Sequence, residues 1–293
     1  MKIVVTIPAY NEAKSIGRLI REIKKSMGSG RYNYNILVVD DGSTDKTADI
    51  AKKSGAVVYS HPKNYGLAET FNTEIKKCLE LKADVIVHID ADCQYLPKEI
   101  PRLVKEIKNG YDLVLGSRFE GKIEHMPLIK KIGNTAFSKV VSQITRIRVT
   151  DAQTGFRAFT KEVAQLPIIS NHTYTQEQII RAVKNKFRIK EVPIYFAKRD
   201  GESKLIRNPF EYAAKASINI IRIYRDFEPL KFFGILGSLI FGVGIVLGLY
   251  LVYFQFFGGG AFRHLGLMML DILILSIGLQ VIIFGFLADM YIR

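Results

Sequence analysis

Oxygen-bearing side chains gather in one short stretch, Asp90-Ala91-Asp92-Cys93-Gln94, which follows a run of β-branched residues. In an extended segment alternate residues share a side, so Asp90, Asp92 and Gln94 would face a single hard cation together. Neighbouring carboxylates repel one another, and a divalent ion between them removes that repulsion. Because Mg²⁺ usually completes its shell with phosphate oxygens, the stretch predicts a divalent-metal site that meets a phosphorylated ligand.

The elements that must position this stretch alternate between β-branched runs and helical patterns. This rhythm is typical of parallel strands joined by crossover helices, so we expect an α/β sheet. Polar or acidic residues follow most of the strands, and an open α/β sheet places its ligand crevice at those ends. The expected strands are Ile3–Ile7, Ile36–Val39, Val57–Tyr59, Val85–Ile89 and Leu113–Gly116, and the expected helices are Ser15–Met27, Asp45–Ser54, Leu67–Leu81 and Pro97–Asn109.

The run Asp40-Asp41-Gly42-Ser43-Thr44-Asp45 follows the second expected strand and has two readings. Aspartate at a strand end can bind a ligand, but it also forms turns and caps helices. Either Ser43 or Thr44 is the expected cap of the next helix. The first strand is not followed by Gly-Xaa-Gly-Xaa-Xaa-Gly, and the chain has no Gly-Lys-Ser/Thr phosphate loop. The sequence therefore lacks the main motifs of dinucleotide oxidoreductases and of P-loop enzymes, which argues against both classes.

The end of the chain has the pattern of a membrane anchor. A stretch of 26 residues, Phe232–Phe257, has no formal charge. At about 1.5 Å per residue, a helix of that length exceeds the roughly 30 Å hydrocarbon thickness of a bilayer. A second apolar stretch, Leu265–Tyr291, follows a link that is short enough for a hairpin turn. We therefore expect two membrane-spanning helices that return the chain to its starting side.

The net charge of +14 lies entirely on residues 1–231, because the tail adds two basic and two acidic residues. Such a surplus usually marks a polyanionic partner, namely nucleic acid, phosphate or anionic lipid. Basic residues cluster just before the first span, which favours a cytoplasmic position for the preceding domain. Residues 208–230 have the amphipathic pattern of a helix in the membrane interface, with an ordinary surface helix as the alternative. Asp271 in the second span has either a transport role or an interfacial, helix-pairing role.

Several blocks of residues follow one another in an order that is typical of one enzyme family. They are Pro8-Ala9-Tyr10-Asn11-Glu12, Asp40-Asp41-Gly42-Ser43-Thr44-Asp45, Asn64-Tyr65-Gly66-Leu67-Ala68, Asp90-Ala91-Asp92-Cys93-Gln94, Gly116-Ser117-Arg118, Asp151-Ala152-Gln153-Thr154-Gly155-Phe156-Arg157 and Gly201-Glu202-Ser203-Lys204. With them, residues 2–207 resemble the inverting family-two glycosyltransferases with the GT-A fold, and among these the polyprenyl-phosphate or dolichyl-phosphate sugar transferases. The resemblance implies a Rossmann-like α/β domain with a mostly parallel sheet.

The resemblance also implies roles for individual residues. Those that would line the nucleotide pocket are Pro8, Tyr10, Glu12, Asp40 and Asp90. Those that would hold Mg²⁺ or Mn²⁺ on the diphosphate of the donor are Asp92 and Gln94, with Asp90 beside them. The basic residues that would meet the acceptor phosphate or the departing diphosphate are Arg118, Lys130, Arg199 and Lys204.

Two of these implied roles remain open. The family pattern places an arginine where this chain has Lys198, with Arg199 beside it, so either residue can be the one that closes on the diphosphate. Glu177 lies roughly where relatives with other acceptors keep a base, and its alternative role is that of a carboxylate at the start of a helix. A lipid phosphate is already an anionic nucleophile, so it needs little help from a base.

The implied function is transfer, with inversion, of a hexose or N-acetylhexosamine from a nucleotide-sugar to polyprenyl (dolichyl) phosphate, for protein N-glycosylation or cell-surface glycans. UDP-glucose and UDP-N-acetylglucosamine are favoured over GDP-mannose as the donor. The expected division is a catalytic domain at 1–207, a juxtamembrane helix at 208–230 and a two-helix transmembrane hairpin at 231–293. The expected location is the cell membrane, with the catalytic domain in the cytoplasm. The oligomeric state stays open, a homo-oligomer included.

Three other readings of the chain compete with this one. A processive polysaccharide synthase would carry a Gln-Xaa-Xaa-Arg-Trp motif, and the chain contains no Trp. Nucleic-acid binding would suit the charge, but no recognition motif appears, so nucleic acid is not an expected partner. A non-catalytic membrane scaffold or flippase partner that retains the fold is the main alternative.

Overall fold

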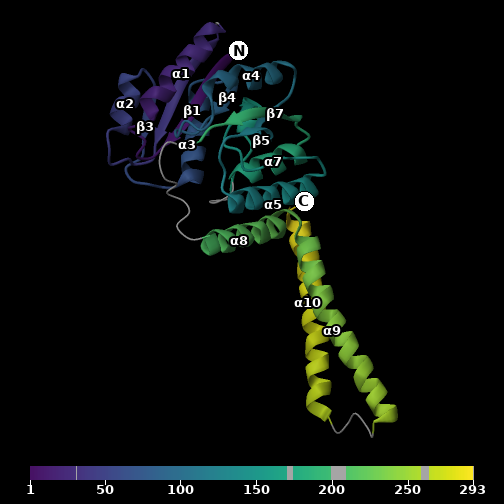
Figure 1. The fold of residues 1–293 in the computed structure, drawn as a ribbon. Helices are drawn as coiled ribbons and strands as arrows, with labels where there is room; N and C mark the ends of the chain where they lie inside the picture. Colours follow the sequence, from purple (N-terminus) through teal and green to yellow (C-terminus); the bar gives the residue numbers. More distant parts are fainter. Residues whose placement is uncertain (31, 170–173, 199–208, 259–263, 293) are drawn as a thin grey trace. The chain divides into compact units, whose positions relative to one another are not determined.

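The computed structural model describes residues 1–30, 32–169, 174–198, 209–258 and 264–292, and it forms two compact units, Met1–Ala216 and Ser217–Arg293. The strands of the first unit are β1 Lys2–Ala9, β2 Asn33–Asp40, β3 Val57–Ser60, β4 Val85–His88, β5 Leu113–Ile123, β6 Arg157–Thr160 and β7 Ile189–Phe196. Within the described residues these strands make one sheet in the order β3-β2-β1-β4-β6-β5-β7 (Figure 1).

The sheet is mixed but mostly parallel, as the sequence predicted. β1 pairs in parallel with β2 and with β4, and β2 pairs in parallel with β3. β6 runs antiparallel to both β4 and β5, whereas β5 and β7 are parallel. All five expected strands are present, and β6 and β7 are additional to them. The parallel part brings the carboxyl ends of β1, β2 and β4 to the same edge of the sheet.

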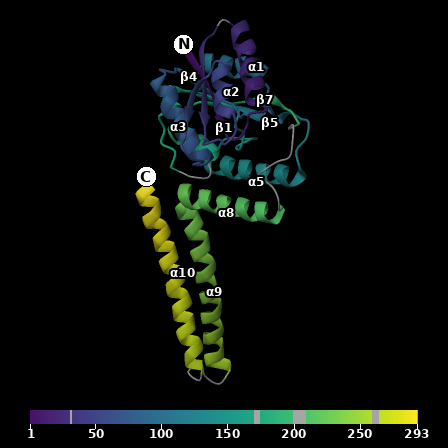
Figure 2. The ribbon, with the colours of Figure 1, turned by 90° about the vertical axis from the view of Figure 1, so that its left-hand side faces the viewer.

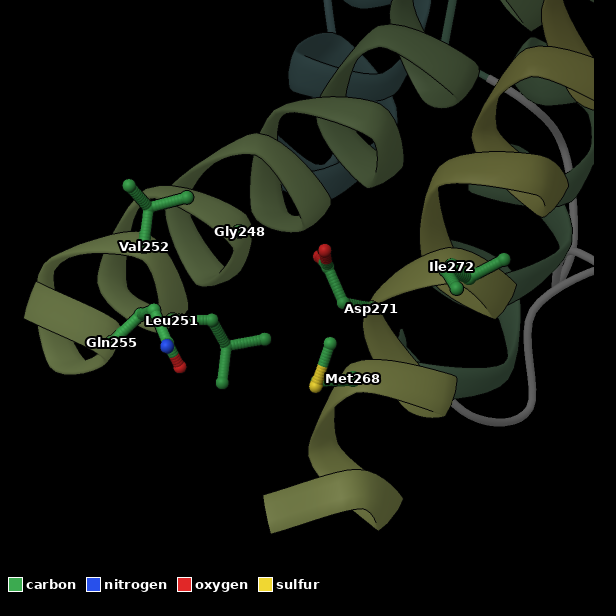
Figure 3. A pocket seen from close by; sticks show the side chains of 7 residues that line it. All are labelled: Gly248, Leu251, Val252, Gln255, Met268, Asp271 and Ile272. Carbon is green, nitrogen blue, oxygen red and sulfur yellow. The ribbon is translucent and has the colours of Figure 1, made fainter. Parts of the chain in front are cut away.

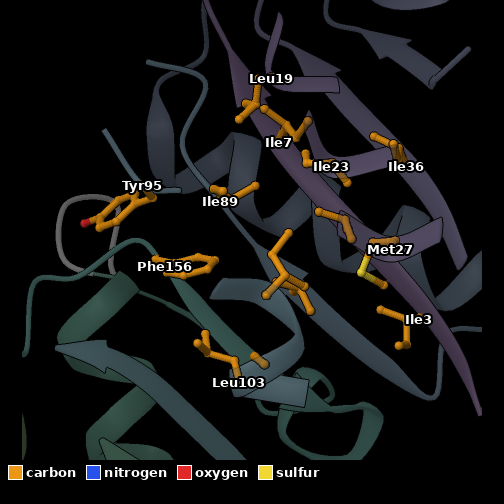
Figure 4. Close-up of a cluster of buried hydrophobic side chains, with 14 of the residues drawn as sticks. Ile3, Ile7, Leu19, Ile23, Met27, Ile36, Ile89, Tyr95, Leu103 and Phe156 are labelled. Atoms are coloured by element: carbon orange, nitrogen blue, oxygen red, sulfur yellow. The ribbon is translucent and has the colours of Figure 1, made fainter. Parts of the chain in front are cut away.

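Helices pack on the sheet and bury their apolar sides. In the first unit they are α1 Ile16–Ser29, α2 Thr47–Lys53, α3 Leu67–Glu80, α4 Ile100–Lys108, α5 Leu128–Thr145, α6 Lys161–Ala164 and α7 Tyr174–Lys184, with a 3₁₀ turn at Pro97–Glu99. Leu19 and Ile23 of α1 and Leu103 of α4 belong to one buried cluster with Ile7 of β1 (Figure 4). Each such side chain stabilises the fold by about 1.5–3 kcal/mol. This core holds β1 and β4 rigidly at the edge where the candidate site lies.

The start of α2 differs from expectation, because neither Ser43 nor Thr44 caps it. The backbone N–H of Thr47 donates to Asp45 Oδ1 at 2.9 Å. Ser43 and Thr44 instead bind the loop after β1: Ser43 Oγ accepts from the Asn11 N–H at 2.9 Å, and the Thr44 N–H donates to Asn11 Oδ1 at 2.9 Å. The two side chains were wrongly assigned to the helix because a contact between two loops cannot be read from local sequence.

The second unit contains two long apolar helices, α9 Pro229–Phe257 and α10 Leu265–Ile292, which run side by side (Figure 2). Each has a window of mean hydropathy 2.5, and only 17% and 6% of those windows are buried within the structure. Exposure of that extent is unlike the core helix of a soluble protein, and both helices are long enough to cross a membrane. α8, Pro209–Phe227, precedes α9 where the sequence predicted an interfacial helix.

Glycines allow α9 and α10 to approach closely. A Cβ atom added at Gly278 would lie 2.6 Å from the Phe241 backbone nitrogen, and one at Gly248 would lie 3.1 Å from Asp271 Oδ2. Small residues at contact points are typical of helix pairs in membranes. The Asp271 side chain points toward α9 and lines a hollow of about 380 Å³ formed by residues of this unit (Figure 3). Among the described residues, Asp271 Oδ1 is buried without a hydrogen-bond partner.

Candidate active site

The stretch from Asp90 to Gln94 forms a turn after β4, and not the extended segment that the sequence predicted. Cys93 has φ 60, in the left-handed region, and Asp92 Oδ1 accepts a hydrogen bond from the Gln94 N–H at 3.1 Å. The expectation that Asp90, Asp92 and Gln94 share one side of a strand is therefore wrong. An aspartate that bonds the backbone two residues further on favours a turn over a strand. The three side chains still lie within one short turn, which we call the β4 turn (residues 89–94).

Asp90 is half-buried, and among the described residues it has no hydrogen bond or ion pair. Its carboxylate lies against the backbone of Gly155, where an added Cβ atom would come within 2.6 Å of Asp90 Oδ2. Any side chain at position 155 would push the carboxylate away. Asp90 thus keeps acceptor positions for a ligand while its place is set by close packing.

Tyr95, the residue after the β4 turn, holds Gly155 from another side. The Gly155 N–H donates to the Tyr95 hydroxyl oxygen at 3.2 Å. Burial, reinforced by the Asp90 and Asp151 charges and opposed by Arg118, raises the pKa of Tyr95 to about 12, so its hydroxyl stays protonated at neutral pH. Gln94 is also fixed, because its Nε2 donates to the Ala197 carbonyl at 3.1 Å.

The loops after β1 and β2 lie at the same edge of the sheet. Ala9 pairs with Asp40 and Thr6 pairs with His88, so β1 lies between β2 and β4 in register. The Glu12 N–H donates to Thr47 Oγ1 at 2.9 Å, which ties the loop after β1 to α2. The structure therefore brings the predicted nucleotide residues Pro8, Tyr10, Glu12 and Asp40 to the edge that carries the β4 turn.

Asp41 has a role that the sequence did not reveal. Its Oδ1 accepts from the Tyr65 N–H at 2.9 Å and lies 2.8 Å from His61 Nδ1, and its Oδ2 accepts from the Gly66 N–H at 2.9 Å. The carboxylate is thereby occupied by three protein groups. Asp41 fixes the segment before α3, whereas the carboxylate of the neighbouring Asp40 has one hydrogen bond among the described residues, from the Ser43 N–H at 3.3 Å.

Arg118 was expected to grip the acceptor phosphate, and it lies in a buried pair with Asp151. Arg118 Nε and Nη2 donate to the two Asp151 oxygens, each at 2.7 Å, and the Arg118 N–H adds a third bond at 3.0 Å. Burial acts to lower the pKa of Arg118, but its interactions with Tyr95 and with the Asp151 carboxylate outweigh burial and raise the pKa, so the guanidinium stays charged. The two residues belong to separate motif blocks, and nothing in the sequence indicated that they pair.

The other basic residues with a predicted phosphate role are Lys130, Arg199 and Lys204. Lys130 lies in the first turn of α5 and is half-buried. Arg199 and Lys204 lie outside the described residues. The Lys198 N–H donates to Glu124 Oε2 at 2.8 Å, which leaves the choice between Lys198 and Arg199 open. The phosphate roles of these residues stay predictions.

Glu177 has the contacts of a structural carboxylate. It is 1% exposed in the first turn of α7, and its Oε1 accepts from Arg181 Nε at 2.6 Å. The Ile169 N–H donates to the same carboxylate at 3.1 Å. These contacts match the alternative of a carboxylate at the start of a helix, and the base role gains no geometric support.

The β4 turn offers oxygen ligands of the kind that bind a hard divalent cation, but too few to fill the coordination shell of the cation. In the described part of the chain, no three His, Cys, Asp or Glu side chains come together as a metal cluster. The turn offers the Asp90 and Asp92 carboxylates and the amide oxygen of Gln94, which are ligand types that Mg²⁺ and Mn²⁺ accept. Asp90, Asp92 and Gln94 would hold such a cation together with further oxygens from a bound ligand.

The known proteins that match this chain agree on one family. Residues 4–166 match the model of "Glycosyl transferase family 2". A protein of Methanocaldococcus jannaschii described as uncharacterized is 41% identical over 66% of this chain and 80% of its own length. UDP-N-acetylglucosamine--dolichyl-phosphate N-acetylglucosaminyltransferase of Methanococcus voltae is 34% identical over 66% and 84%, and dolichyl-phosphate hexose transferase of Haloferax volcanii is 32% identical over 75% and 93%.

A solved structure has the same fold. The glucosyl-3-phosphoglycerate synthase of Mycobacterium tuberculosis, crystallised with Mn²⁺, uridine diphosphate and phosphoglyceric acid, aligns with a TM-score of 0.61. The alignment covers 76% of this chain and 77% of that one, at 22% identity. At this identity the likeness concerns the GT-A-like fold alone.

Proposed function

Because the chain belongs to glycosyl transferase family 2, we propose that it transfers a hexose or N-acetylhexosamine from a nucleotide-sugar to polyprenyl (dolichyl) phosphate, with inversion at the sugar carbon. The observation that carries this proposal is the Asp90 carboxylate, which is fixed by packing but unpaired among the described residues, at the edge shared by β1, β2 and β4. The named acceptors of the relatives from Methanococcus voltae and Haloferax volcanii support a lipid phosphate.

The proposed site holds Mg²⁺ or Mn²⁺ through Asp92 and Gln94, with Asp90 beside them. The oxygen-bearing side chains of the β4 turn, and the Mn²⁺ and uridine diphosphate in the crystallised neighbour, support this assignment. When bound, the cation neutralises charge on the diphosphate. The chain's own part is to fix these oxygens in advance: Tyr95 and Gly155 hold Asp90 in place, and the Gln94 N–H orients Asp92.

The chemistry asks more of positioning than of proton transfer. A phosphate monoester is anionic near neutral pH, so its oxygen attacks the anomeric carbon without a strong base. The larger task is to bring two anions together and to stabilise the departing diphosphate with fixed positive charge. Arg118, still charged in its Asp151 pair, and Lys130 supply charge in the described residues, and Arg199 and Lys204 are proposed to add more.

The two apolar helices would anchor the enzyme in the membrane that contains its lipid acceptor. A polyprenyl chain stays in the bilayer, so its enzyme has to work at the membrane surface. α9 and α10 are long enough to anchor the chain in a membrane, and the basic residues before α9 favour a cytoplasmic catalytic domain. We propose the division into residues 1–207, 208–230 and 231–293 on the same grounds.

The donor is proposed to be UDP-N-acetylglucosamine or UDP-glucose, with GDP-mannose as the competitor. The test is transfer of labelled sugar to polyprenyl phosphate by membranes that contain the full chain, with each donor in turn and with Mg²⁺ or Mn²⁺. Organic-phase label with one donor is the expected result. Absence of lipid-linked product with every donor would favour the non-catalytic scaffold.

A further inference from the structure

A series of polar groups is buried between the sheet and α3, on the face of β1 and β4 that alternates with the apolar core. Thr6 of β1, Glu74 of α3 and His88 of β4 are each 0% exposed. Thr6 Oγ1 donates to Glu74 Oε1 at 2.8 Å, and His88 Nε2 lies 3.3 Å from Glu74 Oε2. His88 Nδ1 donates to the Gly155 carbonyl at 2.6 Å. The series runs from β1 through α3 and β4 to the segment before β6.

Stability alone does not account for this arrangement. Burying an acid beside an imidazole has a large desolvation cost, and apolar residues of similar volume are often at least as stable. Glu74 Oε2 and His88 Nε2 also have no hydrogen bond of good geometry within the described residues. A buried polar pair that is incompletely satisfied calls for another explanation, and here the explanation lies at the Gly155 end.

The His88 ring has a fixed orientation. Its centroid lies 5.7 Å from that of Phe71 and 5.9 Å from that of Tyr174, and these two rings stack on each other at 4.3 Å. A carbonyl oxygen only accepts, so His88 Nδ1 carries the hydrogen toward Gly155. The ring therefore acts as a rigid donor aimed at a single backbone carbonyl.

Three side chains contact Gly155 from different sides, and one of them is Asp90 of the candidate site. His88 binds its carbonyl, Tyr95 binds its N–H, and its Cα faces the Asp90 carboxylate. His88 is also two residues before Asp90 on the same chain, and the Ile89 N–H that lies between them donates to the Thr6 carbonyl at 3.1 Å. Displacement of Gly155 or of the end of β4 would therefore move Asp90.

We propose that His88 is a positioning residue, which, with Glu74 and Thr6, fixes Gly155 against Asp90 and thereby aims the Asp90 carboxylate at the metal-bound donor. This inference rests on the proposed function of the β4 turn. It assigns His88 no contact with the substrate. Loss of His88 should weaken the binding of the donor and its cation, whereas the lipid acceptor should bind as before.

The test compares two substitutions of His88 in the full chain purified in detergent. His88→Asn keeps an amide donor near the position of Nδ1, and His88→Leu removes it. The first readout is Mn²⁺ binding in the presence of UDP, followed by electron paramagnetic resonance; the second is the pair of KM values for donor and acceptor. Glu74→Gln, which keeps the size of the side chain, serves as a second perturbation if His88→Leu does not fold. His264→Leu, in the other unit, is the control.

We expect His88→Leu to weaken Mn²⁺ binding and to raise the donor KM by roughly 10- to 100-fold, the range found when groups behind metal ligands are removed. The acceptor KM should stay unchanged, Glu74→Gln should have a smaller effect of the same kind, and His88→Asn should restore most of the binding. Equal Mn²⁺ binding in His88→Leu and wild type, or equal loss toward donor and acceptor, would overturn the inference. A wild type that binds Mn²⁺ with UDP but transfers no sugar would refute the proposed function, while the His88 comparison would still be decided by the binding data.

Discussion

The loop after β2 and the β4 turn lie at the same edge of one sheet, yet Asp41 in the loop and Asp90 in the turn have opposite surroundings. Asp41 in the loop is occupied by His61 and by two backbone N–H groups. Asp90 in the turn has no hydrogen bond or ion pair among the described residues. Asp151 resembles Asp41, because Arg118 occupies both of its oxygens. We call Asp41 and Asp151 the closed carboxylates.

This difference separates scaffold from site. A buried carboxylate is tolerated when protein donors satisfy it, and a closed carboxylate has little capacity left for a ligand. A carboxylate that packing holds in place, and that receives no hydrogen bond from the protein, can bind a cation or accept a hydrogen bond from a sugar hydroxyl. Substitution of a closed carboxylate should therefore affect folding, and substitution in the β4 turn should affect turnover.

The largest effect should come from Asp151→Asn. It leaves the buried Arg118 guanidinium without its counter-charge, and breaking such a pair typically costs about 3–5 kcal/mol. We expect the free energy of unfolding, measured by denaturant titration with circular dichroism in detergent, to fall by that amount. Asp49→Asn on the exposed side of α2 is the matched control. Unchanged stability of Asp151→Asn would contradict the distinction between the closed carboxylates and those of the β4 turn.

Next in size is the effect of Asp92→Asn or Asp90→Asn on catalysis. Removal of one preorganised charged group from an active site typically lowers kcat by about 10²- to 10³-fold. We expect a loss of this order in sugar transfer, with an unfolding curve that superimposes on that of the wild type. Retention of the full rate by Asp92→Asn would reject the proposed metal role.

A smaller effect should follow from Asp41→Asn. One of its oxygens becomes an amide NH₂ that faces a backbone N–H, and leaving a buried group unsatisfied costs about 1–3 kcal/mol. The expected readout is a lower unfolding free energy, together with faster amide hydrogen exchange at Tyr65 and Gly66. Normal protection of both amides would show that Asp41 does not hold the segment before α3.

The smallest effect is expected for Asp271→Asn in the second unit. Asn keeps a polar group beside Gly248 but replaces the carboxyl group with an amide, and Asp271 has no part in the β4 turn. The transfer rate should stay within about twofold, which is roughly 0.4 kcal/mol in activation free energy. A loss as large as that of Asp92→Asn would give the hairpin a catalytic role and extend the site beyond the sheet edge.

Local patterns in the sequence were sufficient to predict the five strands, four helices and two apolar helices. β-Branched runs and apolar stripes are properties of neighbouring residues, so they can be read directly. β6 was missed because Arg157–Thr160 has no run of β-branched residues and belongs to a motif that was read for its chemistry. Its antiparallel pairing with β4 and β5 depends on partners far along the chain.

The site was predictable by residue type but not by geometry. The oxygen donors at 90–94 were identified correctly as neighbours, but the left-handed Cys93 that turns the chain was not expected. Arg118 and Asp151 lie 33 positions apart, and no local rule predicts their pairing. The same holds for His88 and Gly155, 67 positions apart. Side-chain contacts of this kind are set by tertiary packing, so the closed carboxylates became visible only in the fold.

The most direct test of the account is a crystallographic anomalous-difference map of the full chain with UDP and Mn²⁺. We expect a Mn²⁺ peak in the β4 turn, about 2.0–2.3 Å from an Asp92 oxygen, bonded also to the UDP diphosphate, with Asp41 and Asp151 still bound to their protein donors. A Mn²⁺ ion bound at a closed carboxylate, or UDP bound away from the edge formed by β1, β2 and β4, would contradict it.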